Sequence, residues 1–361
     1  MTPPPPPKPQ VGSIAPYVAG KSIEEIAAAY GLVPESIAKL ASNENPYGPS
    51  PEVVEAIKRV ASTVHMYPSQ SMHGLRKRMA EYVGTEPERV LPTPGMDGLI
   101  EYVLRAFVCD GDEVIITSPT FSYYEIASLA CGARVVHVPR KHFEVCAHDV
   151  LERASERTKV VFVCSPNNPT GNTVPLDVVE ELADSLRAIV FVDEAYVEFS
   201  SCSLLGELLD YDNVVIGRTL SKAFGLAGLR VGYGVLPSCL MEPCQRVATP
   251  FALSSVAQAA AEGALADIEY MRECVSRIRR DRELLYDIPF KTYPSEANFV
   301  LVDVAPFTAA EVCERLLKKG IIVRDCTGFY GMGKSYVRIS VGTREQTKRV
   351  VEAMKEIHSE L

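Results

Sequence analysis

The stretch Thr219-Leu-Ser-Lys-Ala-Phe-Gly-Leu-Ala-Gly-Leu-Arg-Val-Gly232 decides how the rest of the chain is interpreted. It carries Lys222 between two runs typical of buried strands, Val214-Val-Ile-Gly-Arg before it and Val231-Gly-Tyr-Gly-Val after it. Lysine is seldom buried without a partner, and a buried lysine shifts its pKa readily, as Schiff-base chemistry requires. Taken alone, the stretch fits a solvated lysine on a surface loop equally well.

Around this stretch, predicted strands and helices alternate along the chain. We expect strands at 114–117, 134–138, 160–164, 189–193 and 214–217, with helices at 121–131 and 176–186. Alternation of this kind is typical of a mainly parallel sheet covered by helices on both faces. The sequence therefore predicts an α/β fold with a large domain of this type.

The two ends of the chain follow a different pattern. Helices are expected at 22–30, with Ser22 and Glu25 forming a capping box, at 52–64, at 74–83 and in a stretch that ends at Phe107. Turn residues dominate 39–51, and a long helical region at 254–285 precedes strands at 299–303, 321–324 and 336–341. We divide the chain into a disordered proline-rich tail (1–12), an arm contributing to the small domain and to dimer contacts (13–45), a large domain (46–250) and a small α+β domain (251–361).

Composition excludes several classes of function. The net charge of −9 over 361 residues argues against a nucleic-acid partner, which would select a basic face. No apolar run is long enough for a membrane span, and no signal peptide is expected. The ten cysteines are scattered without a C-x-x-C pair, and the six histidines lack ligand spacing. We therefore expect free thiols in a reducing cytoplasm and no metal site.

Polar residues follow the predicted strands at their carboxyl ends. Asn168 lies in Ser-Pro-Asn-Asn-Pro-Thr-Gly after one strand, Asp193 and Tyr196 follow the next, and Lys222 follows the one after that. Ligands of open α/β sheets bind at this edge, so the four side chains can face one site. The turn at Gly95 enters a helix whose N–H groups suit a phosphate. A lysine for an aldehyde, an acid for a pyridine nitrogen and a phosphate turn together favour pyridoxal phosphate.

A second motif points to another class of function. Residues 328–335, Gly-Phe-Tyr-Gly-Met-Gly-Lys-Ser, match the nucleotide-binding pattern G-x-x-x-x-G-K-[ST]. That pattern binds phosphate only where a helix follows the lysine, whereas Tyr336-Val-Arg-Ile-Ser-Val341 alternates as a strand does. Nucleotide binding is therefore the unfavoured alternative.

Longer motifs carry a resemblance to a known family. SPNNPTG (165–171), VDEAYVEF (192–199), RTLSKAFGLAGLRVGY (218–233) and RISVGTREQ (338–346) resemble those of the fold-type I pyridoxal-phosphate aminotransferases. LASNENPYGPSP (40–51) and MYPSQ (66–70) extend the similarity, which runs from about Ile14 to the C-terminus. Within the class II branch, the chain is most similar to the histidinol-phosphate aminotransferases. The resemblance implies a seven-stranded, mainly parallel sheet and a homodimer.

The resemblance also implies roles for individual residues. Lys222 would bind the cofactor aldehyde and move a proton between the substrate Cα and the cofactor C4′, with Asp193 on the pyridine nitrogen. Asn168 and Tyr196 would hydrogen-bond the phenolic oxygen, and Phe121 would stack on the ring where the family usually has tyrosine. The residues implied for the cofactor phosphate are Gly95, Met96, Asp97, Thr219, Ser221, Arg230 and, from the neighbouring subunit, Tyr67.

The substrate side is implied by the same resemblance. Arg338 would take the acidic group of the substrate, with Arg324, Tyr17 and Asn43 placed to bind a phosphate or carboxylate. The reaction implied is transamination between L-histidinol phosphate and 2-oxoglutarate, in histidine biosynthesis. Transamination of aromatic amino acids and decarboxylation of threonine phosphate share the same core residues and stay open as alternatives.

Overall fold

The large sheet has seven strands, five of which run parallel side by side. The computed structural model describes residues 5–14 and 22–361. The strand order is β2-β8-β7-β6-β5-β3-β4, and only the pairings of β8 with β2 and with β7 are antiparallel. The strands are β2 (Val90–Thr93), β3 (Glu113–Ser118), β4 (Arg134–Pro139), β5 (Thr158–Cys164), β6 (Ile189–Asp193), β7 (Val214–Thr219) and β8 (Gly232–Val235). This confirms the predicted α/β fold class and its mainly parallel sheet.

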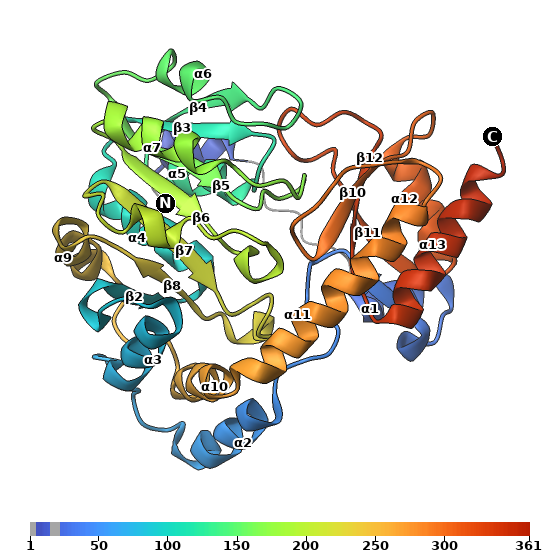
Figure 1. The fold of residues 1–361 in the computed structure, drawn as a ribbon, viewed down its shortest axis with the longest axis horizontal. Coiled ribbons are helices and arrows are strands. Elements are labelled where there is room, and N and C mark those ends of the chain that lie inside the picture. Colours follow the sequence, from blue (N-terminus) through green and yellow to red (C-terminus); the bar gives the residue numbers. More distant parts are fainter. Residues whose placement is uncertain (1–4, 15–21) are drawn as a thin grey trace.

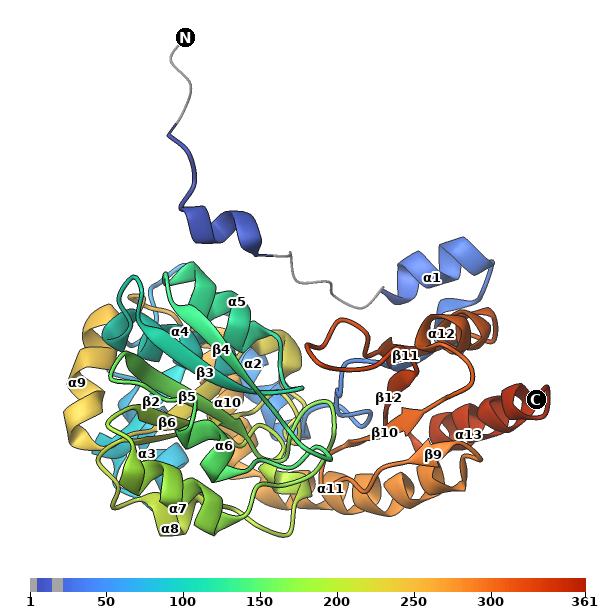
Figure 2. The same ribbon diagram turned by 90° about the horizontal axis from the view of Figure 1, so that it is seen from above.

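Helices cover both faces of this sheet, as the alternation predicts. Figure 2 shows α4 and α5 on one face and α7 and α8 on the other. The central strands are therefore buried on both sides, and β3, β6 and β7 are buried at every residue. The helices of this part are α2 (Pro51–Val60), α3 (His73–Val83), α4 (Gly95–Phe107), α5 (Tyr123–Ala130), α6 (Ala147–Leu151), α7 (Leu176–Ser185), α8 (Leu205–Leu208), α9 (Ser238–Val247) and α10 (Ser255–Ala266).

A second sheet of five strands lies beside the first (Figure 1). Its order is β1-β11-β12-β10-β9, in which only the pairing of β1 with β11 is parallel. The elements are β1 (Ala38–Leu40), β9 (Lys291–Thr292), β10 (Phe299–Asp303), β11 (Ile321–Asp325), β12 (Tyr336–Ser340), α1 (Ile23–Tyr30), α11 (Ile268–Arg282), α12 (Ala309–Lys318) and α13 (Arg344–His358). The N-terminal segment thus joins the small sheet through β1.

Several predicted boundaries differ from the structure for identifiable reasons. The turn-rich segment 39–51 begins inside β1, a strand of three residues that is too short to show periodicity. The helical region at 254–285 is interrupted at Asp267, whose side chain caps α11 by accepting from the Tyr270 N–H. Part of the tail expected to be disordered forms a 3-10 helix, Pro9–Ser13, in which Gln10 donates to Asp110 at 2.7 Å.

The division into domains stays a prediction, but packing bears on one boundary. α10 packs closely against α2 and α3 of the large sheet's layer. α11 then runs from that layer toward the small sheet (Figure 1). These contacts favour a boundary within α11 rather than near residue 250.

Candidate active site

A cavity of about 420 Å³ lies where the carboxyl ends of the large sheet meet the small sheet. Most of the residues predicted for the site line it. They are Asn43, Met96, Asp97, Phe121, Asn168, Asp193, Tyr196, Thr219, Ser221, Lys222, Arg230, Arg324 and Arg338. Side chains from both sheets therefore converge on one space, as the position of the motifs at strand ends predicts.

Lys222 stands in the loop that follows β7 and points its amine into this cavity. Its Nζ donates to the Ser42 carbonyl oxygen at 3.2 Å and lies 5.8 Å from the ring centre of Tyr196. Burial and, to a smaller extent, the nearby positive charge of Arg338 together lower the pKa of Lys222 to about 8. The amine is thus neutral more often than an exposed lysine, which makes it a better nucleophile.

Asp193, the last residue of β6, is the buried acid of the cavity. One carboxylate oxygen accepts from the Tyr124 hydroxyl at 2.5 Å and the other from the Ala195 N–H at 2.9 Å. Burial raises the pKa of Asp193 to about 6, against the hydrogen bond from Tyr124, which lowers it. At neutral pH the group is an anion that can pair with a protonated nitrogen.

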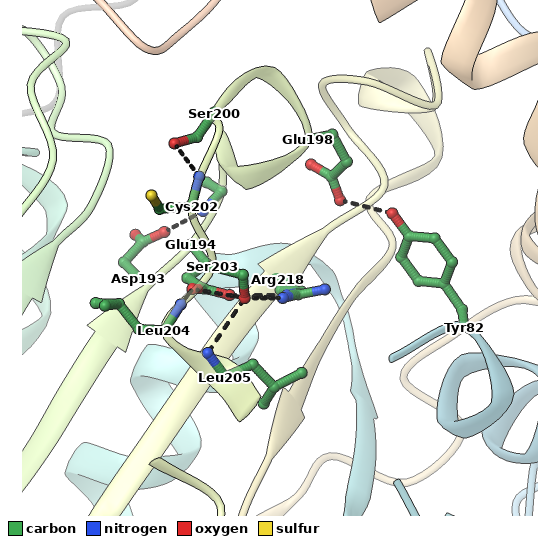
Figure 3. A network of polar contacts seen from close by, with 11 residues as sticks. Tyr82, Asp193, Glu194, Glu198, Ser200, Cys202, Ser203, Leu204, Leu205 and Arg218 are labelled. Carbon is green, nitrogen blue, oxygen red and sulfur yellow. Dashed lines mark hydrogen bonds and ion pairs between the residues drawn. The ribbon is translucent and has the colours of Figure 1, made fainter. Parts of the chain in front are cut away.

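Glu194 follows Asp193 and belongs to a different network (Figure 3). Its carboxylate accepts from Arg218 Nε at 2.9 Å, from the Ser203 hydroxyl and from the Leu204 N–H at 2.6 Å. Glu194 does not line the cavity. Its contacts fasten the loop after β6 to β7.

The N-terminus of α4 forms an anion site at one end of the cavity. Gly95, its first residue, has φ +73°, and a Cβ there would lie 2.9 Å from Nη2 of Arg230. Arg230 pairs with Asp97 at 2.9 Å and contacts the Ser221 hydroxyl at 3.4 Å. The hydroxyls of Thr219 and Ser221 are 3.0 Å apart. Helix N–H groups, a guanidinium and two hydroxyls together suit a phosphate dianion.

Asn168 and Tyr196 lie between the lysine and the small sheet. The Tyr196 hydroxyl accepts from Nδ2 of Asn43 at 3.0 Å, and the Asn168 side-chain oxygen accepts from Arg338. Asn43 itself adopts φ +56° and is held by Ser340, which donates to its side-chain oxygen at 2.7 Å. Because Asn43 is only 1% exposed, it orients Tyr196 within the cavity wall.

Two arginines face each other on the small-sheet wall. Arg324 of β11 and Arg338 of β12 are direct partners across the antiparallel pair, and both line the cavity. Arg338 is 5% exposed and also donates to the Ala41 carbonyl oxygen at 2.5 Å. The guanidinium of Arg324 lies 5.7 Å from the ring centre of Phe329. Two guanidinium groups on one wall suit a substrate with a multiply charged anionic group.

The remaining predicted residues differ in how they relate to the cavity. Phe121 lines the cavity and meets Tyr124 edge-on at 5.5 Å, so its ring can cover a planar group there. Tyr67 is 83% exposed, stacks on Phe251 at 4.7 Å and does not line the cavity of its own chain. Tyr17 lies outside the described residues.

The structure adds lining residues that the sequence reasoning missed. Cys164, Ala195 and Phe329 line the cavity, and Tyr124, which does not line it, donates its hydroxyl hydrogen to Asp193. Little in the sequence distinguishes these residues. Tyr124 is one of several aromatic residues after Pro119, and Phe329 falls inside the apparent nucleotide motif. That motif is followed by β12 rather than by a helix, which removes the geometry it needs.

Metal-ligand clusters and membrane-spanning helices are both absent from the described residues. Among them there is no group of three or more His, Cys, Asp or Glu side chains arranged to hold a metal ion. In the part of the chain that the structure describes, no helix combines the length and the apolar character that crossing a membrane requires.

These residues fit pyridoxal phosphate. The cavity offers an amine of lowered pKa, a buried carboxylate, a flat aromatic wall at Phe121 and an anion site in which a Cβ at position 95 would collide with Arg230. The fold and the site together define a pyridoxal-phosphate-dependent enzyme of the fold-type I class. Residues 35–354 match the model of the family described as aminotransferase class I and II. The chain belongs to this family.

Individual relatives are similar over nearly their whole length. The chain is 49% identical to a histidinol-phosphate aminotransferase of Methanosarcina mazei, covering 98% of this chain and 97% of that protein. It is 42% identical to the enzyme of the same name from Methanocaldococcus jannaschii, covering 97% and 96%. A crystal structure of the Sinorhizobium meliloti histidinol-phosphate aminotransferase with pyridoxal-5'-phosphate has a TM-score of 0.86 at 27% identity, with 97% of each chain covered.

Proposed function

We propose that this aminotransferase transfers the amino group of L-histidinol phosphate to 2-oxoglutarate, giving imidazole-acetol phosphate and L-glutamate in histidine biosynthesis. The observation that carries this choice is the Arg324–Arg338 pair on the small-sheet wall, which provides two cations for a phosphate-bearing donor. The same pair suits the two carboxylates of the acceptor. The archaeal relatives named histidinol-phosphate aminotransferase support the same reaction.

The cofactor, when bound, supplies the electron sink that transamination requires. Lys222 would hold its aldehyde carbon and then take the proton from the Cα of the amino donor. Asp193 would hold a proton on the pyridine nitrogen, because a buried carboxylate next to that nitrogen favours the cation. Asn168 and Tyr196 would orient the phenolic oxygen, and Phe121 would cover the ring and exclude water.

The phosphate of the cofactor would lie at the N-terminus of α4. We assign it to the N–H groups of Gly95, Met96 and Asp97 and to Thr219, Ser221 and Arg230. The salt bridge from Asp97 holds Arg230 in place for this contact. The donor substrate would lie at the other end, on Arg324 and Arg338, with Asn43 in the wall beside Tyr196.

The active site would be shared between two copies of the chain. Tyr67 is exposed beside Phe251, and we expect it to contact the cofactor phosphate of the neighbouring subunit. A homodimer related by two-fold symmetry would bury this aromatic pair. All ten cysteines are free thiols, in keeping with an enzyme of the reducing cytoplasm.

A panel of half-reactions tests the substrate. The holoenzyme would be mixed with histidinol phosphate, phenylalanine, tyrosine or threonine phosphate while the visible absorbance of its cofactor is followed. We expect histidinol phosphate to react fastest. Faster reaction with an aromatic amino acid, or carbon dioxide release from threonine phosphate, would overturn the substrate assignment but not the family. Lys222→Ala should abolish every half-reaction while the protein stays folded.

Arg324→Ala sharpens the same test. Losing one charge-assisted contact to phosphate costs about 1.5–3 kcal/mol, so the affinity for histidinol phosphate should fall roughly ten- to more than a hundredfold. The affinity for phenylalanine should change much less. Lys334→Ala removes a cation from the nearby apparent nucleotide motif and serves as the matched control, since Lys334 does not line the cavity. Equal loss for both substrates would contradict a phosphate contact at Arg324.

Mixed dimers test the shared site. Tyr67→Phe and Lys222→Ala variants would be purified separately, mixed, and allowed to exchange subunits. Partial recovery of activity is expected, because one of the two sites in a mixed dimer receives both native residues. Mixed dimers that form without any recovery would contradict a site built from both chains.

A further inference from the structure

Arg140 is a buried cation without an anionic partner. It follows β4, is 5% exposed, and makes no salt bridge with any carboxylate in residues 5–14 and 22–361. Its Nε donates to the Thr117 carbonyl oxygen at 3.1 Å, and its Nη2 donates to the Thr117 hydroxyl at 3.1 Å and to the Cys164 carbonyl oxygen at 3.3 Å. Its Nη1 has no hydrogen-bond partner in this part of the chain. Burying a charge costs free energy unless an opposite charge or hydrogen bonds compensate it, so the burial of Arg140 requires an explanation.

The nearest ionisable neighbours do not supply a negative charge. Burial lowers the pKa of Arg140 to about 10, so the guanidinium stays charged at neutral pH. Burial raises the pKa of the Cys164 thiol to about 12, which keeps that group neutral. Burial also raises the pKa of Tyr124 well above its ordinary value. Arg140 is therefore a cation surrounded by neutral groups.

The strand order brings this cation close to the strand that carries Asp193. The strands β6, β5, β3 and β4 are successive neighbours, and Asp193, Cys164, Thr117 and Arg140 stand at or near their carboxyl ends. The guanidinium reaches back across β3 to the backbone of Cys164, which is the direct partner of Asp193. Adjacent strands are about 4.8 Å apart, so roughly one strand spacing separates the charge from β6.

Tyr124 contacts Asp193 directly and lies close enough to Arg140 for the two side chains to interact electrostatically. It is fully buried, its ring stacks on Phe162 at 4.5 Å and 4°, and its hydroxyl donates to Asp193 at 2.5 Å. The stack fixes the direction of the hydroxyl, since the ring cannot rotate away without leaving Phe162. On the cavity side, Asp97 and Lys222 are the charged groups that act on Asp193, Asp97 raising its pKa and Lys222 lowering it.

We propose that Tyr124 and Arg140 are positioning residues for Asp193: the Tyr124 hydroxyl aligns its carboxylate, and the unpaired Arg140 charge behind it keeps that carboxylate ionised. The inference rests on the proposed function, in which Asp193 binds the pyridine nitrogen of the cofactor. It gives Arg140 a reason to be buried as a cation. Neither residue touches the reacting atoms.

The test follows the ionisation of Asp193 in the apoprotein of the full chain. The infrared band of its protonated carboxyl group is identified by its absence in Asp193→Asn, and its intensity is measured against pH. Tyr124→Phe keeps the stacked ring and should raise the pKa of Asp193 by about one to two pH units, the strength of a charge-assisted hydrogen bond. Arg140→Met should raise it by about one unit, the size of the interaction between two charges about 10 Å apart at an effective dielectric constant of 20. Arg140→Lys, which keeps the charge, should recover most of that shift.

Cofactor affinity supplies a second readout. With the pKa of Asp193 moved from about 6 to between 7 and 8, its ionised fraction at pH 7 falls about two- to tenfold, and the affinity of the apoprotein for pyridoxal phosphate should fall similarly. Two control variants remove matched buried groups elsewhere. Tyr102→Phe removes a buried hydroxyl that binds the Thr249 N–H, and Arg282→Met removes a buried arginine that binds the Ala297 carbonyl oxygen.

The outcomes are distinct. If folded Tyr124→Phe and Arg140→Met both titrate within about 0.3 unit of the wild type, or if the controls shift as much as they do, the inference is overturned. Should Arg140→Met not fold, Arg140→Gln keeps hydrogen-bond donors without the charge and must show the same shift. A shift in Arg140→Lys as large as that in Arg140→Met would overturn the part assigned to charge. A dispensable Asp193, with Asp193→Asn fully active, would instead refute the proposed function and leave the titration result standing.

Discussion

Asp193 and Glu194 are neighbours in the chain, yet they belong to two regions with opposite electrostatic designs. Both are nearly fully buried, with 3% and 1% of their surface exposed. Asp193 lines the cavity and accepts only from neutral donors, the Tyr124 hydroxyl and the Ala195 N–H. Glu194 accepts from a guanidinium, a hydroxyl and a backbone N–H (Figure 3). The carboxylate of Asp193 can therefore still pair with a cation that arrives with the cofactor, whereas the carboxylate of Glu194 is already paired with Arg218 within the fold.

The end of β6 thus serves two purposes, catalysis and stability. Successive residues of a strand point to opposite sides, so an acidic pair at the end of β6 sends one side chain to each. The cavity side carries the chemistry, and the side of Glu194 holds the loop that leads to α8. Changes to the two residues should therefore separate activity from stability.

The largest effect is expected for Asp193→Asn. An amide cannot hold the proton on the pyridine nitrogen, so turnover should fall about 10²- to 10³-fold, the usual cost of removing one preorganised electrostatic contact. The free energy of unfolding of the apoprotein should not fall, because a buried charge is removed. Steady-state kinetics and urea denaturation measure the two quantities. A near-normal rate would show that Asp193 is structural and would erase the contrast with Glu194.

Glu194→Gln should produce the reverse pattern. It leaves Arg218 buried without its main counterion, which costs about 3 kcal/mol of unfolding free energy. We use the low end of the usual range because Glu198 also acts on the Arg218 charge. Turnover per folded molecule should stay close to that of the wild type. Glu242→Gln, which breaks the exposed pair with Arg246, is the control and should change little.

The cavity should respond to pH through Lys222. Because burial lowers the pKa of Lys222 to about 8, the neutral amine that captures the cofactor becomes about tenfold more abundant between pH 7 and pH 9. The rate of cofactor uptake by the apoprotein should rise by the same factor in rapid-mixing absorbance measurements. The folded pKa lies below the ordinary value of 10.5, so the unfolded chain binds more protons between pH 8 and 10.5 and stability rises with pH there. A flat uptake rate would contradict a buried amine.

The smallest effect is expected for Ser203→Ala. Its hydroxyl donates to Glu194 at 3.2 Å and accepts from Arg218 at 2.7 Å, but the ion pair remains without it. The loss should be about 1 kcal/mol of unfolding free energy, with no change in the rate of either half-reaction. A stability loss as large as that of Glu194→Gln would mean that the hydroxyl, rather than the ion pair, holds the loop.

Much of the fold could be predicted because its central strands are buried on both faces. The residues of runs such as 160–164 and 189–192 are all apolar, and that composition identifies a covered parallel strand. Short strands such as β1 and β9 escaped prediction, since two or three residues carry no periodicity and gain their partners only in the folded molecule. The end of α10 was hidden for a similar reason, because Asp267 interrupts an otherwise helical composition.

The sequence by itself determined the class of chemistry. Asp193 ends a buried strand, and Asn168 and Lys222 lie in the loops that follow the strands on either side of it, so local pattern and the geometry of parallel sheets bring them to one edge. The apparent nucleotide motif was also resolved locally, because the strand that follows it shows in the alternation of its side chains.

Only the tertiary structure decided which residues support that chemistry. Tyr124 meets Asp193 across 69 positions of sequence, and Arg324 meets Arg338 only because β11 and β12 pair in one register. Arg140 reaches Cys164 because β4 lies two places from β5 in the sheet. No local pattern encodes such contacts, since strand order and register depend on the packing of the whole core.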